Sequence, residues 1–290
     1  MTGGTAYRPR RSVLYLPGNN ERALEKAKTL PVDGLILDLE DAVAPDHKEV
    51  ARENVCRAAR SGDYGQREVT IRVNPFGTPW HEGDVAAACA AGPAGIVVPK
   101  VGSADEVRDL VAAMEHHGAP EHTSLWAMIE TPAAVLDVRG IAAASDRLAV
   151  LVLGVNDLVK ELGARHVAGR EPLLATLSLS LLAARAAGIA ILDGVWNDVR
   201  DLHGFEDECR QGRDLGFDGK TLIHPAQVEP CNRVFAPSPE EVQEARGIVD
   251  AWEAGDGAGV VTYGGRMVES LHVDIARRVI ATDEAIRSRR

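Results

Sequence analysis

Two neighbouring stretches, LWAMIETP at residues 125–132 and LAVLVLGVNDL at residues 148–158, decide the fold of this chain. Each is a short and nearly continuous apolar run followed by a carboxylate, Glu130 after the first and Asp157 after the second. Runs of this kind are typical of parallel strands that are buried on both faces. Between them, Thr131 and Pro132 form a helix start signal, with threonine at the N-cap and proline at the first helical position. The two stretches therefore predict a strand, a helix and a second strand with polar groups at the strand ends.

The same pattern recurs along the chain. Helical patterns cover residues 46–59, 104–116, 132–143 and 171–187. Eight apolar runs occur, at residues 13–16, 35–39, 69–73, 95–99, 125–129, 148–153, 189–192 and 219–223. Eight strands that alternate with helices indicate an α/β protein with a (β/α)₈ TIM barrel. A doubly wound sheet is the competing architecture, but no GxGxxG motif follows the first run.

The pattern changes after the eighth run. Helices are expected over residues 226–234 and 240–254, and a last helix over residues 271–287. The Gly-rich stretch GDGAGVVTYGG, residues 255–265, reads as a flexible joint between them. We therefore expect a barrel over residues 1–253 and a C-terminal helical arm over residues 254–290 that packs elsewhere, over a neighbouring subunit's site.

Composition excludes several functions. The chain has 290 residues with 32 Lys and Arg against 43 Asp and Glu, so its net charge is −11. This acidity argues against a nucleic-acid partner or a polybasic membrane patch, because both require concentrated positive charge. The four cysteines form no CxxC pair, and no apolar segment near the N-terminus reads as a secretory signal. We expect a cytoplasmic protein with no nucleic acid and no membrane among its partners.

Charged side chains follow most of the predicted strands, and a barrel brings all strand ends to one mouth. The acidic ones outnumber the basic ones, Arg72 and Lys100. They are Asp38, Glu40, Asp41, Glu130 and Asp157. Crowded carboxylates repel one another unless a cation lies among them. A ligand set made only of oxygen suits Mg²⁺, with Mn²⁺ as the alternative. Lys100 is expected to pair with acidic neighbours.

Several motifs together resemble one family. They are RSVLYLPGNNERALEKA (11–27), LDLEDAV (37–43), IRVNP (71–75), VPKV (98–101), the Glu of IETP, the Asp of GVNDL and FDGKTLIHP (217–225). They stand in the same order in the citrate lyase β-subunit-like group of the HpcH/HpaI aldolase superfamily, and the resemblance spans residue 11 to about residue 281. Within that group the chain looks most like malyl-CoA lyases, citramalyl-CoA lyases and (3S)-malyl-CoA thioesterases, and closest to the thioesterases.

The resemblance implies roles for the mouth residues. Glu130 and Asp157 would be the two protein ligands of Mg²⁺, although Asp157 also fits a cap on a short helix over residues 158–162. Arg72 would bind the substrate carboxylate, because its planar fork contacts both oxygens, and a salt bridge to Glu40 or Asp41 is the alternative. Asp38, Glu40 and Asp41 would hold Arg72 and metal-bound water, and a purely structural network is the alternative for Asp38. The catalytic residues implied are Arg72, Asp41 and Glu269.

Coenzyme A is the second ligand that the resemblance implies. Arg22 and Lys26 stand where the family's basic residues meet the CoA phosphates. They lie four residues apart on one predicted helix, so an ordinary solvated face with Glu25 is the alternative.

Glu269 departs from the lyase pattern. Lyases carry GxMVD here, and its Asp reaches over a neighbouring subunit's barrel as an acid/base; this chain reads GRMVE over residues 265–269. The longer side chain moves the carboxylate by about 1 Å, enough to change a rate about 10²-fold. An exposed glutamate beside the arm helix is the alternative.

The function that follows from the resemblance is a Mg²⁺-dependent enzyme of CoA esters. A malyl-CoA-type substrate would be cleaved at a C–C bond to acetyl-CoA and a 2-oxo acid. The alternatives are a (3S)-malyl-CoA thioesterase that releases malate and CoA, and a citrate lyase β-subunit that works on an acyl carrier protein. The same resemblance implies a homotrimer or a homohexamer.

Overall fold

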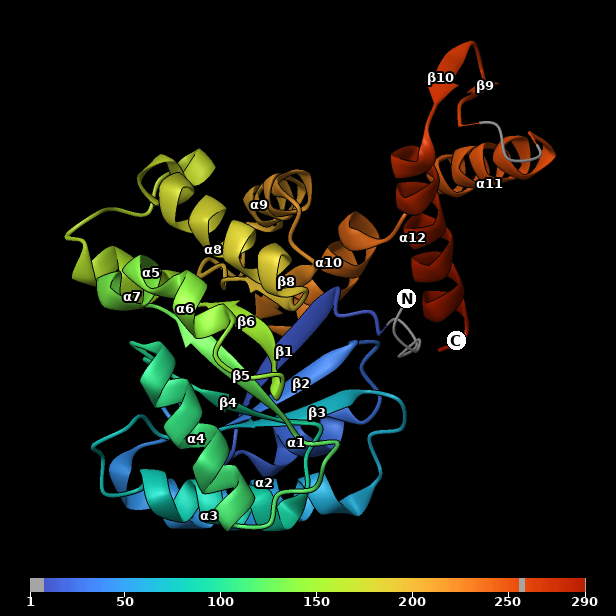
Figure 1. The fold of residues 1–290 in the computed structure, drawn as a ribbon. Coiled ribbons are helices and arrows are strands. Elements are labelled where there is room, and N and C mark those ends of the chain that lie inside the picture. Colours follow the sequence, from blue (N-terminus) through green and yellow to red (C-terminus); the bar gives the residue numbers. More distant parts are fainter. Residues whose placement is uncertain (1–7, 256–258, 290) are drawn as a thin grey trace. The chain divides into compact units, whose positions relative to one another are not determined.

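The computed structural model describes residues 8–255 and 259–289. Eight parallel strands form a closed barrel, and β8 pairs with β1 to close it (Figure 1). The strands are β1 (Ser12–Pro17), β2 (Gly34–Asp38), β3 (Glu68–Arg72), β4 (Gly95–Val98), β5 (Ser124–Ile129), β6 (Leu148–Leu153), β7 (Ala190–Asp193) and β8 (Gly219–Leu222). Each predicted run overlaps one of these strands and differs from it by at most one residue at either end. The predicted (β/α)₈ barrel is therefore confirmed.

Helices connect consecutive strands and cover the outside of the barrel (Figure 1). The α-helices are α1 (Glu21–Ala27), α2 (Lys48–Ser61), α3 (His81–Ala91), α4 (Ala104–His116), α5 (Pro132–Leu136), α6 (Val138–Ala142), α7 (Val155–Glu161), α8 (Leu174–Ala187) and α9 (Leu202–Leu215). Short 3₁₀ helices are η1 (Pro45–His47), η2 (Ala168–Leu173) and η3 (Pro225–Gln227). Thr131 caps α5 as predicted, by accepting the N–H of Ala134 at 3.1 Å.

One predicted helix is wrong in its continuity. The helical pattern over residues 132–143 is divided into α5 and α6 at Asp137, which has non-helical dihedral angles of φ −106° and ψ 14°. The Asp137 carboxylate accepts the N–H of Ala104 at the start of α4, at 3.1 Å. A short polar side chain that binds a neighbouring backbone competes with helix continuation, which explains the break.

The interior of the barrel is filled by side chains from alternate positions of the strands. Trp126 is fully buried, and the cluster around it also includes Val13, Ile36, Val97, Met128, Val150, Val152 and Leu192. Tyr15 packs against this cluster. These apolar groups fill the interior of the barrel. The polar side chains lie at the carboxyl ends of the strands, as in other barrels of this kind.

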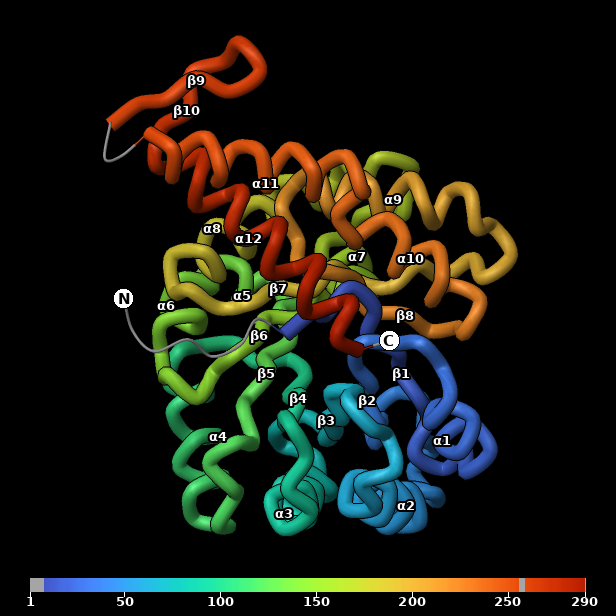
Figure 2. The backbone as a smooth tube through the Cα atoms, turned by 90° about the vertical axis from the view of Figure 1, so that its right-hand side faces the viewer, coloured from blue at the N-terminus to red at the C-terminus, as the bar shows by residue number. Residues whose placement is uncertain are grey.

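The chain divides into two compact units, Arg10–Asn232 and a second unit that takes in the chain from Arg233 on. We call them the barrel unit and the C-terminal unit. The sequence places the end of the barrel at residue 253, but the division between the units comes earlier. The reason is that α11 (Pro239–Ala254) packs along α12 (Ser270–Arg287) and so belongs to the C-terminal unit. Figure 2 shows these two helices side by side. The helix before them, α10 (Val228–Phe235), spans the division.

The expected flexible joint over residues 255–265 is wrong for its second half, which the structure describes. Residues 256–258 lie outside the described part of the chain, but β9 (Val261–Tyr263) and β10 (Arg266–Val268) form an antiparallel hairpin. Its turn is Gly264–Gly265, with φ values of 55° and 76°. Two consecutive positive φ angles are what a tight two-residue hairpin turn requires, and glycine adopts them without steric cost. The glycines therefore specify a turn here.

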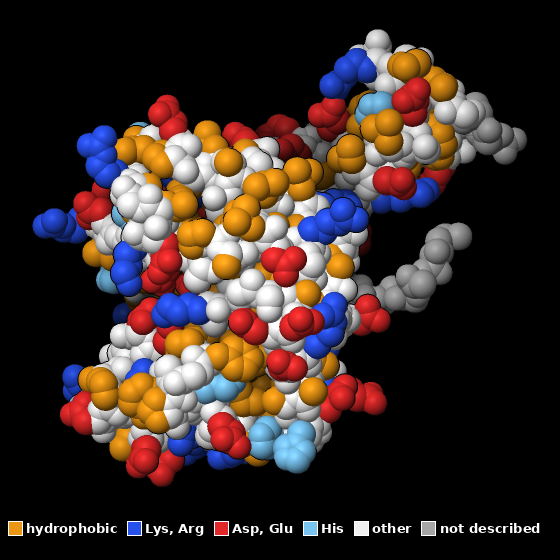
Figure 3. Space-filling view, turned by 60° about the vertical axis from the view of Figure 1, so that its left-hand side comes forward, with side chains coloured by type: hydrophobic (Ala, Val, Ile, Leu, Met, Phe, Trp, Pro, Cys, Tyr) orange, Lys and Arg blue, Asp and Glu red, His pale blue; other side chains and the backbone are white. Residues whose placement is uncertain are grey.

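Several hydrophobic side chains are exposed on each unit. Leu136 of α5 is 89% exposed and Leu182 of α8 is 69% exposed, and Figure 3 shows hydrophobic groups among the charged ones on one face. In the C-terminal unit, Met267 is 62% exposed and Ile275 is 60% exposed. Across residues 8–255 and 259–289, no helix has the length and apolar character needed to cross a membrane.

Candidate active site

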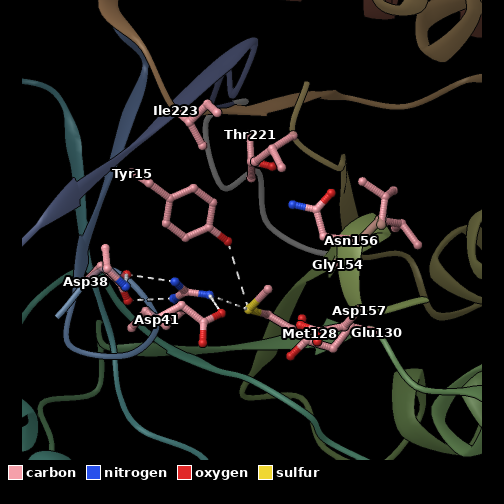
Figure 4. Close-up of a pocket in the computed structure, with 15 residues that line it drawn as sticks. Tyr15, Asp38, Asp41, Met128, Glu130, Gly154, Asn156, Asp157, Thr221 and Ile223 are labelled. Carbon is pink, nitrogen blue, oxygen red and sulfur yellow. Dashed lines mark hydrogen bonds and ion pairs between the residues drawn. The ribbon is translucent and has the colours of Figure 1, made fainter. Parts of the chain in front are cut away.

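A cavity of about 300 Å³ opens at the carboxyl ends of the strands (Figure 4). It contains five of the predicted site residues, which are Asp38, Asp41, Arg72, Glu130 and Asp157. The other residues that line it are Tyr15, Ala42, Met128, Leu153, Gly154, Val155, Asn156, Val195, Thr221 and Ile223. The cavity thus joins acidic groups, one guanidinium and an apolar wall.

Arg72 is held in the cavity from two sides. Asp38 accepts from Arg72 Nε at 2.6 Å and from Nη2 at 2.7 Å, and Glu40 Oε2 lies 2.7 Å from Nη1. The guanidinium lies 4.8 Å from the centre of the Tyr15 ring, in a cation–π contact. Its Nη1 also contacts Met128 Sδ at 3.9 Å. Sulfur is a weak acceptor, so a ligand carboxylate would compete well for this edge of the guanidinium.

Asp38 is ionised in this arrangement. Burial alone would raise the pKa of Asp38, but the Arg72 charge and the N–H groups of Glu40 and Ala42 together lower that pKa below its usual value. Asp41 differs from Asp38 because its side chain is 66% exposed and stands 3.9 Å from Arg72 Nη1. Asp41 thus lies at the rim of the cavity and does not share in the buried ion pair of Asp38 with Arg72.

Glu130 is a buried carboxyl group that forms no ion pair with another residue of the described part of the chain. It is 2% exposed, and one oxygen accepts the backbone N–H of Lys100 at 2.8 Å. Burial, and then the Glu40 and Asp157 carboxylates, raise the pKa of Glu130 to about 8. A divalent cation held by Glu130 and Asp157 would remove this penalty, because it favours the charged form of Glu130. The donor set therefore fits a hard, oxygen-binding ion such as Mg²⁺.

Gly154 makes room for Glu130. A Cβ atom at Gly154 would stand 2.2 Å from Glu130 Oε2 and 2.3 Å from its Cβ, much closer than real side-chain contacts. Gly154 is also the N-cap of α7, so Asp157 stands in the first turn of that helix and not at its cap. The interpretation of Asp157 as a cap is therefore wrong. Its half-buried carboxylate lines the cavity instead.

The predicted CoA residues and Glu269 lie elsewhere. Arg22 and Lys26 are exposed on α1, at the carboxyl end of β1, and do not line the cavity. Glu269 belongs to the C-terminal unit, where it is the N-cap of α12 and its backbone oxygen accepts the N–H of His272 at 3.0 Å. Glu269 N donates in return to His272 Nδ1 at 3.0 Å. The roles of these three residues stay predictions.

Sequence reasoning missed part of the site. Tyr15 and Met128 occupy inward positions of β1 and β5, and strand alternation would have found them. Lys48 is buried and donates to Leu39 O and Glu40 O, both at 2.7 Å, which holds the backbone of the acidic segment after β2. Burial lowers the pKa of Lys48.

Comparison with known proteins decides the family. The family model described as HpcH/HpaI aldolase/citrate lyase matches residues 11–225. The chain belongs to this family. It is 48% identical over 280 residues to a (3S)-malyl-CoA thioesterase of Cereibacter sphaeroides, and the match covers 96% of each chain. It is also 37% identical over 285 residues to the citrate lyase subunit beta of Escherichia coli, a match that covers 96% of this chain and 94% of the other.

Solved structures of the family agree with the fold. CitE of Mycobacterium tuberculosis, in complex with magnesium, acetoacetate and coenzyme A, has a TM-score of 0.78 and 29% identity. That match covers 96% of this chain and 99% of CitE. A citrate lyase of Burkholderia xenovorans has a TM-score of 0.83, covering 97% and 93% of the two chains, at 23% identity, and supports the fold alone.

Proposed function

We propose that this protein is a Mg²⁺-dependent enzyme of malyl-CoA-type esters that cleaves a C–C bond to give acetyl-CoA and a 2-oxo acid. One observation carries the proposal: the buried Glu130 and the neighbouring Asp157 share a cavity with the guanidinium of Arg72. A cation site beside a carboxylate-binding group suits a 2-hydroxy or 2-oxo acid. The magnesium and coenzyme A bound to CitE support the same ligands for this chain.

Each residue of the site has a separate role in the proposed cleavage. Bound between Glu130 and Asp157, Mg²⁺ would supply a Lewis acid for the oxygens of the acid group. Arg72 binds the substrate carboxylate, and Asp38 and Glu40 keep its guanidinium in place. The substrate hydroxyl gives its proton to the carboxylate of Asp41 at the rim of the cavity. The bond between the hydroxyl-bearing carbon and the CH₂ group breaks, and its electron pair passes to the thioester enolate. Glu269 then donates a proton to the enolate carbon.

Thioester hydrolysis is the second candidate, and the 48% identity to a thioesterase favours it. In this reaction Arg72 holds the same malyl group. Glu269 takes a proton from water while the water oxygen attacks the thioester carbonyl, and CoA leaves as malate forms. The glutamate at position 269, in place of the lyase aspartate, supports this alternative.

The remaining parts of the proposal concern coenzyme A and assembly. Arg22 and Lys26, exposed on α1, bind the CoA phosphates, and free CoA rather than a carrier protein delivers the acyl group. The chain forms a homotrimer or a homohexamer in which Glu269 reaches a neighbour's cavity. The exposed hydrophobic groups of the C-terminal unit, Met267, Leu271 and Ile275, support burial against another subunit.

One assay tests the reaction. Purified protein is incubated with malyl-CoA and Mg²⁺, and glyoxylate, acetyl-CoA and free thiol are followed together. Cleavage produces glyoxylate and acetyl-CoA in equal amounts, whereas hydrolysis produces malate and thiol. We expect Glu269→Asp to raise the ratio of glyoxylate to thiol, because the shorter carboxylate restores the lyase pattern. If neither glyoxylate with acetyl-CoA nor malate with thiol forms in the presence of Mg²⁺, the proposal is contradicted. Binding of free acetyl-CoA by the isolated chain would exclude a subunit that depends on a carrier protein.

A further inference from the structure

Lys100 has an unusual backbone for a residue with a side chain. Its φ is 56°, in the left-handed region, and Arg170 is the other non-glycine residue with positive φ in the described part of the chain. This region costs free energy for residues with a Cβ atom, so it persists where surrounding contacts hold it. At Lys100 those contacts are hydrogen bonds to Glu130 and Glu40.

The backbone of Lys100 binds one site carboxylate. β4 ends at Val98, so the N–H of Lys100 has left the strand ladder and is available to a side chain. It donates to Glu130 Oε1 at 2.8 Å, and Glu130 follows the neighbouring strand β5. The turn after β4 thereby orients a carboxylate from the next strand.

The side chain of Lys100 binds a second site carboxylate. Lys100 Nζ donates to Glu40 Oε1 at 2.8 Å, and Glu40 Oε2 lies 2.7 Å from Arg72 Nη1. Glu40 is 4% exposed, so this charge depends on its two cationic partners. A continuous series of contacts thus runs from Glu130 through Lys100 and Glu40 to Arg72.

We propose that Lys100 is a positioning residue that holds Glu130 with its backbone and Glu40 with its side chain, and so sets the placement of the metal site relative to Arg72. This inference rests on the proposed function in one respect, because Glu130 is taken as a Mg²⁺ ligand. The two contacts are separable, since one depends on backbone conformation and the other on the ammonium group.

Three variants separate the two contacts. Lys100→Gly adopts positive φ at no steric cost and keeps the N–H while it removes the ammonium. Lys100→Met also removes the ammonium but keeps a long side chain. Lys100→Val places a β-branched side chain where the left-handed region is strongly disfavoured, and so moves the N–H away from Glu130. Lys160→Met removes an exposed lysine charge on α7 and serves as the matched control.

Titration calorimetry measures the Kd of Mg²⁺, and then the Kd of glyoxylate on the Mg²⁺-loaded protein. Neither measurement requires turnover. For Lys100→Gly and Lys100→Met we expect a Mg²⁺ Kd within about threefold of wild type and a glyoxylate Kd raised about tenfold, as for the loss of a charged hydrogen bond. For Lys100→Val we expect the Mg²⁺ Kd itself to rise about tenfold. Lys160→Met should change neither constant.

The outcomes distinguish this inference from the proposed function. If Lys100 acted only as a charge, its removal would tighten Mg²⁺ binding equally in all three variants, and positioning would be excluded. Wild-type glyoxylate affinity in Lys100→Gly would overturn the side-chain role, and wild-type Mg²⁺ affinity in a folded Lys100→Val would overturn the backbone role. If wild-type protein turns over no malyl-CoA while the variants separate as expected, the proposed function fails and the positioning role stands.

Discussion

Arg72 occupies the cavity because protein carboxylates already fix its orientation. Asp38 binds two of its nitrogens, and Tyr15 covers the face of the guanidinium. A guanidinium held in this way loses little side-chain entropy when a ligand carboxylate arrives. Binding of a ligand carboxylate by Arg72 therefore depends on its several N–H donors and not only on its charge.

Arg72→Lys tests that statement. One ammonium cannot bind both Asp38 oxygens and a ligand carboxylate with the same geometry, so we expect kcat/KM to fall by about 10²-fold or more. The Mg²⁺ affinity, measured by calorimetry, should stay close to wild type because Glu130 and Asp157 are untouched. Near-wild-type kcat/KM would exclude a direct role for Arg72.

Gly154 makes a second prediction at this scale. Gly154→Ala introduces a Cβ within 2.2 Å of Glu130 Oε2, so the carboxylate must move. We expect Mg²⁺ affinity to fall about tenfold or more while the protein stays folded, because an open cavity can accept the displaced group. Gly102→Ala is the matched control, since its nearest contact would be an ordinary 3.6 Å to Glu106. Equal Mg²⁺ affinity in both variants would refute the steric role.

At the scale of elements, Asp193 joins three segments below the cavity. The end of β7 carries it, and it binds Arg170 Nη1 of η2 at 2.6 Å and Lys220 Nζ of β8 at 3.1 Å. Its backbone oxygen accepts the Thr221 hydroxyl at 3.0 Å, and Thr221 lines the cavity. This buried ion network thus holds the strand end next to Thr221, which lines the cavity.

The network predicts a loss of stability in acid. Burial alone would raise the pKa of Asp193, but Lys220 and Arg170 lower it below the unfolded value of about 3.9. A depressed folded-state pKa contributes stability that is complete above the unfolded pKa and is lost as pH falls through the folded one. Guanidinium unfolding at pH 7 and pH 3 measures this loss.

Asp193→Asn tests the prediction. We expect it to lower the free energy of unfolding at pH 7 by about 3 kcal/mol, the lower end for a broken buried ion pair, because Lys220 and Arg170 keep Glu208 as a second carboxylate partner. The variant should also lose less stability than wild type between pH 7 and pH 3. The exposed Asp105→Asn is the control. A variant as stable as wild type at pH 7 would show that the network contributes nothing to folding.

At the scale of the whole molecule, the site and Glu269 belong to different units. Because α11 packs along α12, a deletion of residues 257–290 would uncover α11, and full-length variants test the arm more cleanly. Glu130→Ala and Glu269→Gln should each be inactive. Their co-expressed mixture should recover about a quarter of wild-type activity, the random share of sites with both groups intact across a symmetric interface.

Measurement of kcat per subunit checks this result, with each single variant as its own control. An inactive mixture of folded, assembled subunits would show that the two groups do not meet between chains. Full activity of Glu269→Gln alone would remove Glu269 from the reaction.

The sequence by itself determined the eight strands and their order, because a strand buried on both faces needs a continuous apolar run and each run is local. It also determined that Arg72, Glu130 and Asp157 would meet, since a parallel barrel brings every carboxyl end to one mouth. Local turn chemistry located Thr131 as a cap, and the Gly264–Gly265 pair is a local signal for a hairpin turn.

Only the tertiary structure decided the rest, because it depends on contacts between residues far apart in the chain. The left-handed turn at Lys100 is held by Glu130 and Glu40, which follow β5 and β2 in the chain. The space beside Gly154 is occupied by a side chain from another strand. The division at Arg233 follows from the packing of α11 along α12. No local pattern encodes such approaches, since they arise when the barrel closes and when helices pair.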